Sequence, residues 1–487
     1  MSWSEADLQS SSQGTAKAGR QLGIGFKPRH LTMMSIAGVI GGSLFVSSGS
    51  VIHNAGPAAV LAYLAGGILM MLIMRMLGEM ATTSPDTGSF STYADRAIGS
   101  WAGFTIGWLY WLSWVCIMAW EAYVAGKILH GWFPAISMNA FVLGITLLLM
   151  SVNFFNVRHF GEMEFWFALI KVVAICSFLA ICTLAAMHVW RGGEVIGVAN
   201  LTAHGFVPNG VGAVVGAMLG VMFAFLGAEI ATIAASESKN PQEQIAKTTK
   251  SVIWRVGLFY VGSIFLIVCL VPWNDPFLGE SGYGAYRRTL ELLGVPGAEY
   301  LMNFVVLTSV SSCLVSAHYT ASRMLFSLAV RGDAPSVLKR TRHANGAPIW
   351  AILASCAVPV VLALMNFSEA LRPKDVLDTL MNVTGSTALL VYLVIAFSQL
   401  RMRRKLQEQG TLIPMKMWMY PWLTWAVISF ISICLVMMML SPDYQSVIFS
   451  TGGLTLCIMA VGIIRQTRSP KNTATGASET QAKALLR

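Results

Sequence analysis

Charged residues are scarce in this chain. They make up 11% of its 487 residues, whereas hydrophobic residues make up 55%. An average soluble domain has roughly 25% charged residues, so this composition is typical of a protein that sits in lipid. A soluble chain of this length is expected to form two or three domains of about 150 residues joined by polar linkers. No such linker occurs before about the last twenty residues.

Closely spaced cysteines and catalytic motifs are also lacking. Each of the eight cysteines lies inside an apolar run and none forms a CxxC pair, which argues against a disulfide framework or a zinc site. The apolar runs contain no HExxH, no GxSxG and no paired His/Asp set, so an intramembrane enzyme would have neither a metal centre nor a nucleophile with its base. We therefore expect no cofactor, no metal and no enzymatic activity.

Long apolar runs are abundant. Twelve of them approach the roughly 20 residues that a helix needs to cross the hydrocarbon core of a bilayer. The expected fold is therefore an all-α membrane protein with twelve transmembrane helices. The predicted spans are 31–51, 58–80, 101–129, 139–155, 165–187, 211–235, 251–273, 301–328, 347–367, 376–400, 417–440 and 447–464.

Basic residues are distributed unevenly between the two sides of these spans. With the tail 1–30 placed inside, 26 of the 33 lysines and arginines lie on the cytoplasmic side, 6 lie outside and Lys171 lies alone within a span. Cytoplasmic loops carry the basic excess, so the tails 1–30 and 465–487 are both predicted to be cytoplasmic. The first tail lacks the apolar core of a signal peptide. The net charge of +10 is then a topological signal, and no soluble face is left for nucleic acid.

Two predicted spans contain glycine clusters near their middle. The first reads SIAGVIGGSLF, with Gly38, Gly41 and Gly42, and the sixth reads GAMLGVMFAFLGAEIAT, with Gly227 ahead of Glu229. Many transporters hold substrate where helices are interrupted near the membrane midplane, at matching places in two inverted repeats. The two spans are five helices apart, as expected for repeats 31–187 and 211–400. Bare N–H and carbonyl groups at such interruptions suit a zwitterion, although close helix packing on glycine is the alternative.

Three ionisable residues stand out inside the predicted spans, where a charge costs a few kcal/mol. Lys171, in FWFALIKVVAI, is predicted to exchange the coupling proton, and the alternative is a lysine that only ties the fifth helix to neighbouring carbonyls. Glu229 is predicted to accept a proton or steady a gate, and the alternative is a cap on the N–H groups of a broken helix. Glu121 is predicted to face the substrate ammonium or to pair with a neighbouring helix.

Aromatic residues flank these positions. Phe223 and Phe225 lie beside the interruption in the sixth span, and Trp120 and Tyr123 lie beside Glu121. We consider them as lids of a binding site, against the alternative that they only pack, because membrane helices are rich in aromatic residues in any case.

Four segments, in order, resemble the amino acid-polyamine-organocation transporters, and within them the bacterial amino acid transporter family. They are SIAGVIGGSLF, PDTGSFSTYADRAIG at 85–99, FLGAEIATIAASES at 225–238 and YTASRMLFSLAVRGDAP at 319–335. Within that family the γ-aminobutyrate permeases are most similar, through TIGWLYW, SVIWR and YPWLTW. The resemblance implies a LeuT-like core of ten helices in two inverted five-helix repeats (31–400), two peripheral helices (417–464) and proton-coupled uptake.

The resemblance also implies roles for individual residues. The substrate carboxylate would meet the backbone of the first span around Gly41, while carbonyls of the first and sixth spans would hold the amine. Phe223 would match the family's aromatic gate, and Lys171 would match a lysine that stands where sodium sits in related symporters. The predicted substrate-binding residues are Gly38, Val39, Gly41, Gly42, Ser43, Glu121, Phe223, Phe225 and Gly227, and the predicted proton-coupling residues are Lys171 and Glu229.

The predicted function is proton-coupled import of γ-aminobutyrate or a similar small amino acid across the bacterial inner membrane. The third span reads AWEAY from Ala119 to Tyr123 where γ-aminobutyrate permeases carry PLEAN, and the eighth carries Val315 and His318 where they carry CLNSALYTASRM. These departures keep an α-amino acid, aromatic or basic, as the alternative substrate. A transporter-like sensor is a remote alternative, because the tail after Ile464 is too short for an output domain. The expected partners are the substrate, the proton and the bilayer, for a monomer or an oligomer of unknown size.

Overall fold

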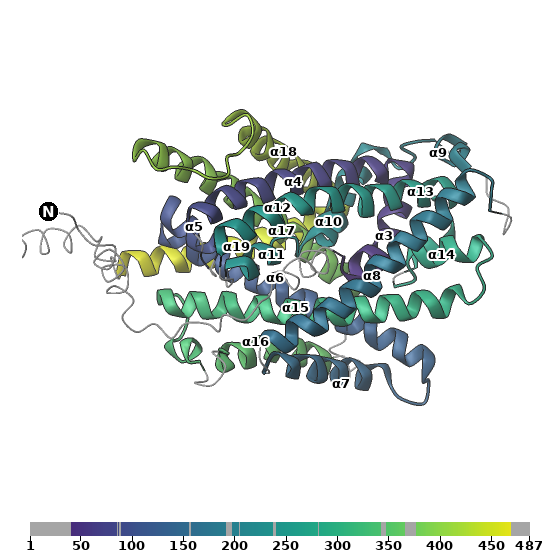
Figure 1. Ribbon diagram of the computed structural model, residues 1–487, viewed down its shortest axis with the longest axis horizontal. Helices are drawn as coiled ribbons and strands as arrows, with labels where there is room; N and C mark the ends of the chain where they lie inside the picture. The colour runs from purple at the N-terminus through teal and green to yellow at the C-terminus, as the bar shows by residue number, and fades with distance from the viewer. Residues whose placement is uncertain are drawn as a thin grey trace, which may run out of the picture.

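The computed structural model describes residues 40–84, 86, 89–154, 157–190, 197–203, 205–236, 240–280, 282–341, 347–365 and 376–468. Every secondary-structure element in these ranges is a helix. The long helices run side by side along the long axis of the molecule, with α5 at one end and α14 at the other (Figure 1).

The helices are apolar enough to cross a membrane. Among the described residues, seven stretches have the length and hydropathy of a membrane span, and four shorter helices are also apolar. One of the seven, Gly42–Thr83, contains both α3 (Gly42–Ala55) and α4 (Ala59–Thr83), joined by the short 3-10 helix η1 (Gly56–Ala58). The prediction of an all-α, multi-pass membrane protein is thus confirmed, whereas the number of twelve crossings stays a prediction.

Each predicted span overlaps at least one described helix. Two begin much earlier than expected, the fifth at Val157 instead of 165 and the seventh at Pro241 instead of 251. The remaining principal helices are α5 (Ser89–Ala97), α6 (Ser100–Trp132), α7 (Met138–Ser151), α8 (Val157–Ala186), α10 (Gly210–Phe225), α11 (Ile230–Ser236), α12 (Pro241–Arg255), η4 (Val256–Gly262), α13 (Ser263–Leu270), α14 (Ala285–Leu292), α15 (Ala298–Arg331), α16 (Ile349–Met365), α17 (Val376–Glu408), α18 (Trp422–Leu440) and α19 (Pro442–Arg468).

Among the described residues, helical structure begins late in the first glycine-rich span and is interrupted in the sixth. α3 begins only at Gly42, because Gly41 before it is extended, with φ −90° and ψ 178°. Gly38 and Val39 lie outside the described residues. In the sixth span α10 ends at Phe225 and α11 begins at Ile230, and between them Gly227 has φ +117°. Because side chains rarely tolerate that φ, the second interruption depends on glycine.

A third irregularity was not predicted. The span expected at 251–273 contains the π-helical segment η4 between α12 and α13. Short π-helical segments inside longer helices are frequently found at functional sites. The fully buried Tyr260 lies on this segment.

The interior of the bundle is organised around two long helices. α6 packs along α15, α5 and α17 pack against α6, and α10 lies among α3, α4 and α17. In Figure 1, α16 and α7 lie along one edge of the bundle and α18 lies at the opposite edge. The most apolar part of α6 is 72% buried, against 33% for α18 and 17% for α19. The last two helices are therefore peripheral and present most of their surface to lipid.

The end of the bundle that holds α14 is closed over α3. The ring of Tyr286 in α14 meets Phe45 in α3 edge-on, with 5.0 Å between ring centroids. A Cβ on Gly284 would lie 2.6 Å from the carbonyl oxygen of Phe45. This close approach requires a glycine at 284, where φ is +88°. The N-terminal residues of α3, Gly42 and Ser43, are buried inside the bundle.

Candidate substrate and coupling site

The N-terminus of α3 presents backbone hydrogen-bond donors inside the protein core. Gly42 and Ser43 are buried, and Gly41 at the N-cap provides no side-chain hydrogen bond. The first N–H groups of a helix have no acceptor within the helix, and the helix dipole adds a partial positive charge there. On the other side of the interruption, the carbonyl oxygen of Ile40 accepts a hydrogen bond from Ser309 of α15 at 3.4 Å.

A carboxyl group faces this helix end. Glu121 of α6 is 1% exposed, and its carboxyl lies against the N–H of Gly42 and the thiol of Cys313. A Cβ on Gly42 would lie 2.6 Å from Glu121 Oε2 and 2.3 Å from Val310 Cγ1. A side chain at 42 would therefore have to displace Val310 and the Glu121 carboxyl.

Lys171 belongs to a buried hydrogen-bonded chain. It projects from α8, and its Nζ donates to the hydroxyl of Ser312 in α15 at 2.9 Å. Ser312 in turn donates to Glu164 Oε1 at 2.7 Å, and Ser316 donates to the same oxygen at 3.0 Å. Lys171 and Glu164 are both 0% exposed. One hydroxyl thus bridges a buried amine and a buried carboxyl.

Glu229 closes the interruption between α10 and α11. Its Oε2 accepts the N–H of Gly227 at 3.1 Å, and its Oε1 accepts the hydroxyl of Tyr110 from α6 at 2.9 Å. On the neighbouring turn, the hydroxyl of Tyr260 donates to the carbonyl oxygen of Ala224 at 2.9 Å. This geometry corresponds to the capping role considered for Glu229, while its proton-accepting role stays a prediction.

The two phenylalanines beside this interruption point in different directions. The ring of Phe223 meets Trp120 of α6, with centroids 5.0 Å apart and planes at 67°. The ring of Phe225 packs instead on Tyr260, with centroids 4.6 Å apart, and on Tyr63 of α4. Of the two candidate lids, Phe223 contacts α6 through Trp120, whereas Phe225 contacts η4 and α4.

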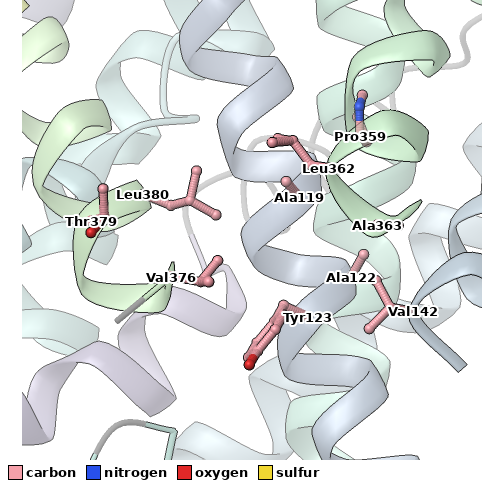
Figure 2. Close-up of a pocket in the computed structure, with 10 residues that line it drawn as sticks. All are labelled: Ala119, Ala122, Tyr123, Val142, Pro359, Leu362, Ala363, Val376, Thr379 and Leu380. Carbon is pink, nitrogen blue, oxygen red and sulfur yellow. The ribbon is translucent and has the colours of Figure 1, made fainter. Parts of the chain in front are cut away.

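Tyr123 lies on a different face of α6 from Glu121. Figure 2 shows it in an apolar cavity of about 200 Å³, together with Ala119 of the same helix, Pro359 of α16 and Leu380 of α17. Residues two positions apart on a helix lie about 200° apart around its axis, so Tyr123 and Glu121 face nearly opposite ways. Trp120, rather than Tyr123, is the aromatic residue of α6 that contacts Phe223.

The structure places most of the predicted residues in three groups in the interior of the bundle. Gly41, Gly42, Ser43 and Glu121 meet at the start of α3, Gly227 and Glu229 form the second interruption, and Phe223 pairs with Trp120. Sequence reasoning missed Glu164, Ser312, Ser316, Cys313 and Tyr110. Within the described ranges, no group of three or more His, Cys, Asp or Glu side chains is placed to hold a metal ion.

Some of the residues that the sequence analysis missed could have been found from their spacing in the sequence. Glu164 is seven residues before Lys171, which places both on one face of a helix two turns apart. The fifth span was predicted to begin at 165, which left Glu164 in a loop, and this boundary is wrong because α8 extends back to Val157. Ser309, Ser312 and Ser316 likewise follow helical spacing along α15.

Comparison with solved structures shows the fold. A manganese transporter from Eremococcus coleocola shares the fold, with a TM-score of 0.58 over 92% of this chain and 97% of that one at 13% identity. The fold is thus the LeuT-like fold of membrane transporters, as the resemblance implied.

Sequence comparison defines the family. The profile of the family described as "Amino acid permease" matches residues 30–468, and the chain belongs to this family. It is 54% identical over 462 residues to a "Probable GABA permease" of Pseudomonas aeruginosa, covering 94% of this chain and 96% of the relative. It is 51% identical over 452 residues to a "Gamma-aminobutyric acid permease" of Escherichia coli, covering 93% and 95%.

Proposed function

We propose that the protein imports γ-aminobutyrate or a similar small amino acid across the bacterial inner membrane, together with protons. The observation that carries this proposal is the free N-terminus of α3 inside the core, next to the buried Glu121. The two relatives named as permeases of this compound support the choice of substrate. The uneven distribution of lysine and arginine supports cytoplasmic positions for both chain termini.

The interruptions provide both halves of a zwitterion site. The N–H groups at Gly41, Gly42 and Ser43 suit a carboxylate, because they are donors at the positive end of a helix. Carbonyl groups freed where α3 and α10 are interrupted suit an ammonium group. Interruptions in the first and sixth spans are what two inverted repeats, 31–187 and 211–400, would place on opposite sides of one substrate.

The chain from Lys171 to Glu164 suits proton exchange. When the Lys171 ammonium gives a proton to the Ser312 oxygen and the Ser312 hydroxyl gives its own proton to Glu164, a charged pair becomes a neutral pair. No atom leaves the site and the hydroxyl is regenerated. Coupling would follow if the site then took up one proton from the side on which substrate binds and gave it up on the side on which substrate is released, with substrate binding shifting this equilibrium.

The test is uptake of radiolabelled γ-aminobutyrate into proteoliposomes under an imposed pH gradient, with unlabelled amino acids as competitors. We expect accumulation that stops when the proton gradient is dissipated. Dependence on a sodium gradient would refute proton coupling. Competition by aromatic or basic amino acids, without competition by γ-aminobutyrate, would reassign the substrate to the α-amino acid alternative.

Lys171→Ala tests the coupling residue. We expect it to abolish accumulation against a gradient, and full proton-driven uptake by this variant would show that the role assigned to Lys171 is wrong. Lys127→Ala is a matched control, because Lys127 also projects from a membrane helix but its side chain is 43% exposed and 3.9 Å from Glu280. An exposed pair of this kind contributes about 0–1 kcal/mol, so the control should transport normally.

A further inference from the structure

We propose that Glu121 is an internal anion of the empty transporter. Its carboxylate occupies the position at the start of α3 that the substrate carboxylate takes on binding, and it moves away to pair with the substrate ammonium. The inference rests on the proposed function, in that a zwitterion binds at α3. It adds a displacement step and a residue that discriminates between substrates.

Two independent observations place the Glu121 carboxyl in the anion position. The first is proximity, because a Cβ on Gly42 would lie 2.6 Å from Oε2 and a Cβ on Gly41 would lie 3.5 Å from Oε1. The second is that Oε2 is buried and has no hydrogen-bond partner of ordinary distance and angle among the described residues. A buried carboxyl oxygen is seldom left in this state, and this oxygen is available to accept a hydrogen bond from a substrate ammonium.

The groups around Glu121 offer its carboxylate limited compensation besides the helix end. Lys171 is close enough to interact with it electrostatically, but the Lys171 ammonium donates to Ser312, beyond which lies Glu164. The other titratable groups described around Glu121 are the thiol of Cys313 from α15 and the phenol of Tyr260 from η4, which carry no positive charge. The N-terminus of α3 carries a partial positive charge.

A substrate carboxylate cannot share this position with an ionised Glu121, because like charges repel strongly in a medium of low polarity. Binding therefore requires Glu121 to move or to take up a proton. An ammonium group several bonds away from the carboxylate, as in γ-aminobutyrate, gives the displaced Glu121 a new partner. Glu121 would thus favour a zwitterion over a simple carboxylic acid of the same length.

Butyrate and γ-aminobutyrate separate these effects, because they differ only in the ammonium group. We would measure binding of each to the purified full-length protein at pH 8 by isothermal titration, for wild type and Glu121→Gln. Removing the competing charge should tighten butyrate binding about tenfold, the effect of one displaced charge interaction of about 1.4 kcal/mol. The preference for γ-aminobutyrate over butyrate should fall at least tenfold. Glu243→Gln, which removes an exposed carboxylate of α12, should change neither value.

Equal butyrate affinity in wild type and Glu121→Gln would overturn the inference. If that variant did not fold, Glu121→Asp would decide, because the shorter side chain draws the carboxylate back from the start of α3 and should tighten butyrate binding. Unchanged butyrate affinity in Glu121→Asp would also overturn the inference. Because butyrate reports the anion position alone, its result stands even if γ-aminobutyrate proves not to be the transported substrate.

Discussion

Ser312→Ala removes the hydroxyl that joins Lys171 to Glu164, and Ser316→Ala is its natural control. Both serines donate to Glu164 Oε1, at 2.7 and 3.0 Å, but only Ser312 also accepts from Lys171, at 2.9 Å. The two variants lose the same atoms from the same helix, one turn apart. They differ in whether the connection between the amine and the carboxyl is broken.

The expected magnitude follows from the two hydrogen bonds lost with Ser312. Hydrogen bonds to charged groups contribute about 1.5–3 kcal/mol each, and about 1.4 kcal/mol corresponds to a tenfold change in rate. Loss of either bond from the proton-transfer step should therefore slow proton-driven accumulation by tenfold or more. Ser316→Ala should lower stability while retaining most of this activity, because the bridging hydroxyl remains.

The assay compares two modes of transport in the same proteoliposomes. Proton-driven accumulation requires the relay, whereas exchange of labelled for unlabelled substrate at equal pH on both sides does not require net proton movement. Ser312→Ala should lose the first and keep the second. The reasoning is refuted if Ser312→Ala accumulates substrate as wild type does, or if Ser316→Ala shows the same selective loss.

Two further predictions concern packing at the interruptions. Gly42→Ala should abolish substrate binding, because the new methyl group would displace Glu121, and it should lower the free energy of unfolding by about 1–3 kcal/mol, the usual effect of overpacking. Binding and thermal unfolding measured on one preparation check this. Wild-type affinity in the variant would contradict it. Phe223→Leu should change which amino acids compete for uptake, whereas Phe225→Leu should lower the melting temperature and leave the competition profile unchanged. An altered profile for Phe225→Leu alone would show that the wrong ring has been assigned to the site.

The sequence was sufficient for the class of fold and for both interruptions, because long apolar runs and clustered glycines have few other physical explanations in a membrane protein. It was insufficient for the start of α8. The apolar run begins after Glu164, but the helix continues past it because Ser312 and Ser316 satisfy that carboxyl within the protein. A helix boundary set by a partner on another helix leaves no mark on its own segment.

Side-chain direction was the second limit. Phe223 and Phe225 have the same chemistry and adjacent places in the sequence, and only the packing of α10 against α4 and α6 decides which ring lies near Trp120. The π-helical segment that carries Tyr260 could not be predicted either, because its residues are ordinary helix-forming or apolar ones. Residue identity and spacing predicted where polar groups are exposed, but not which neighbours they meet.

The left-handed backbone at Gly227 has a consequence for affinity. Because the break between α10 and α11 is encoded by a residue that readily adopts this conformation, the peptide groups are already unwound before any ligand arrives. The entropic cost of ordering the unwound segment is met once, when the protein folds, and does not recur at each turnover. Preorganisation of this kind strengthens binding without any added contact, and a bulkier residue at 227 would shift that cost onto every cycle of transport.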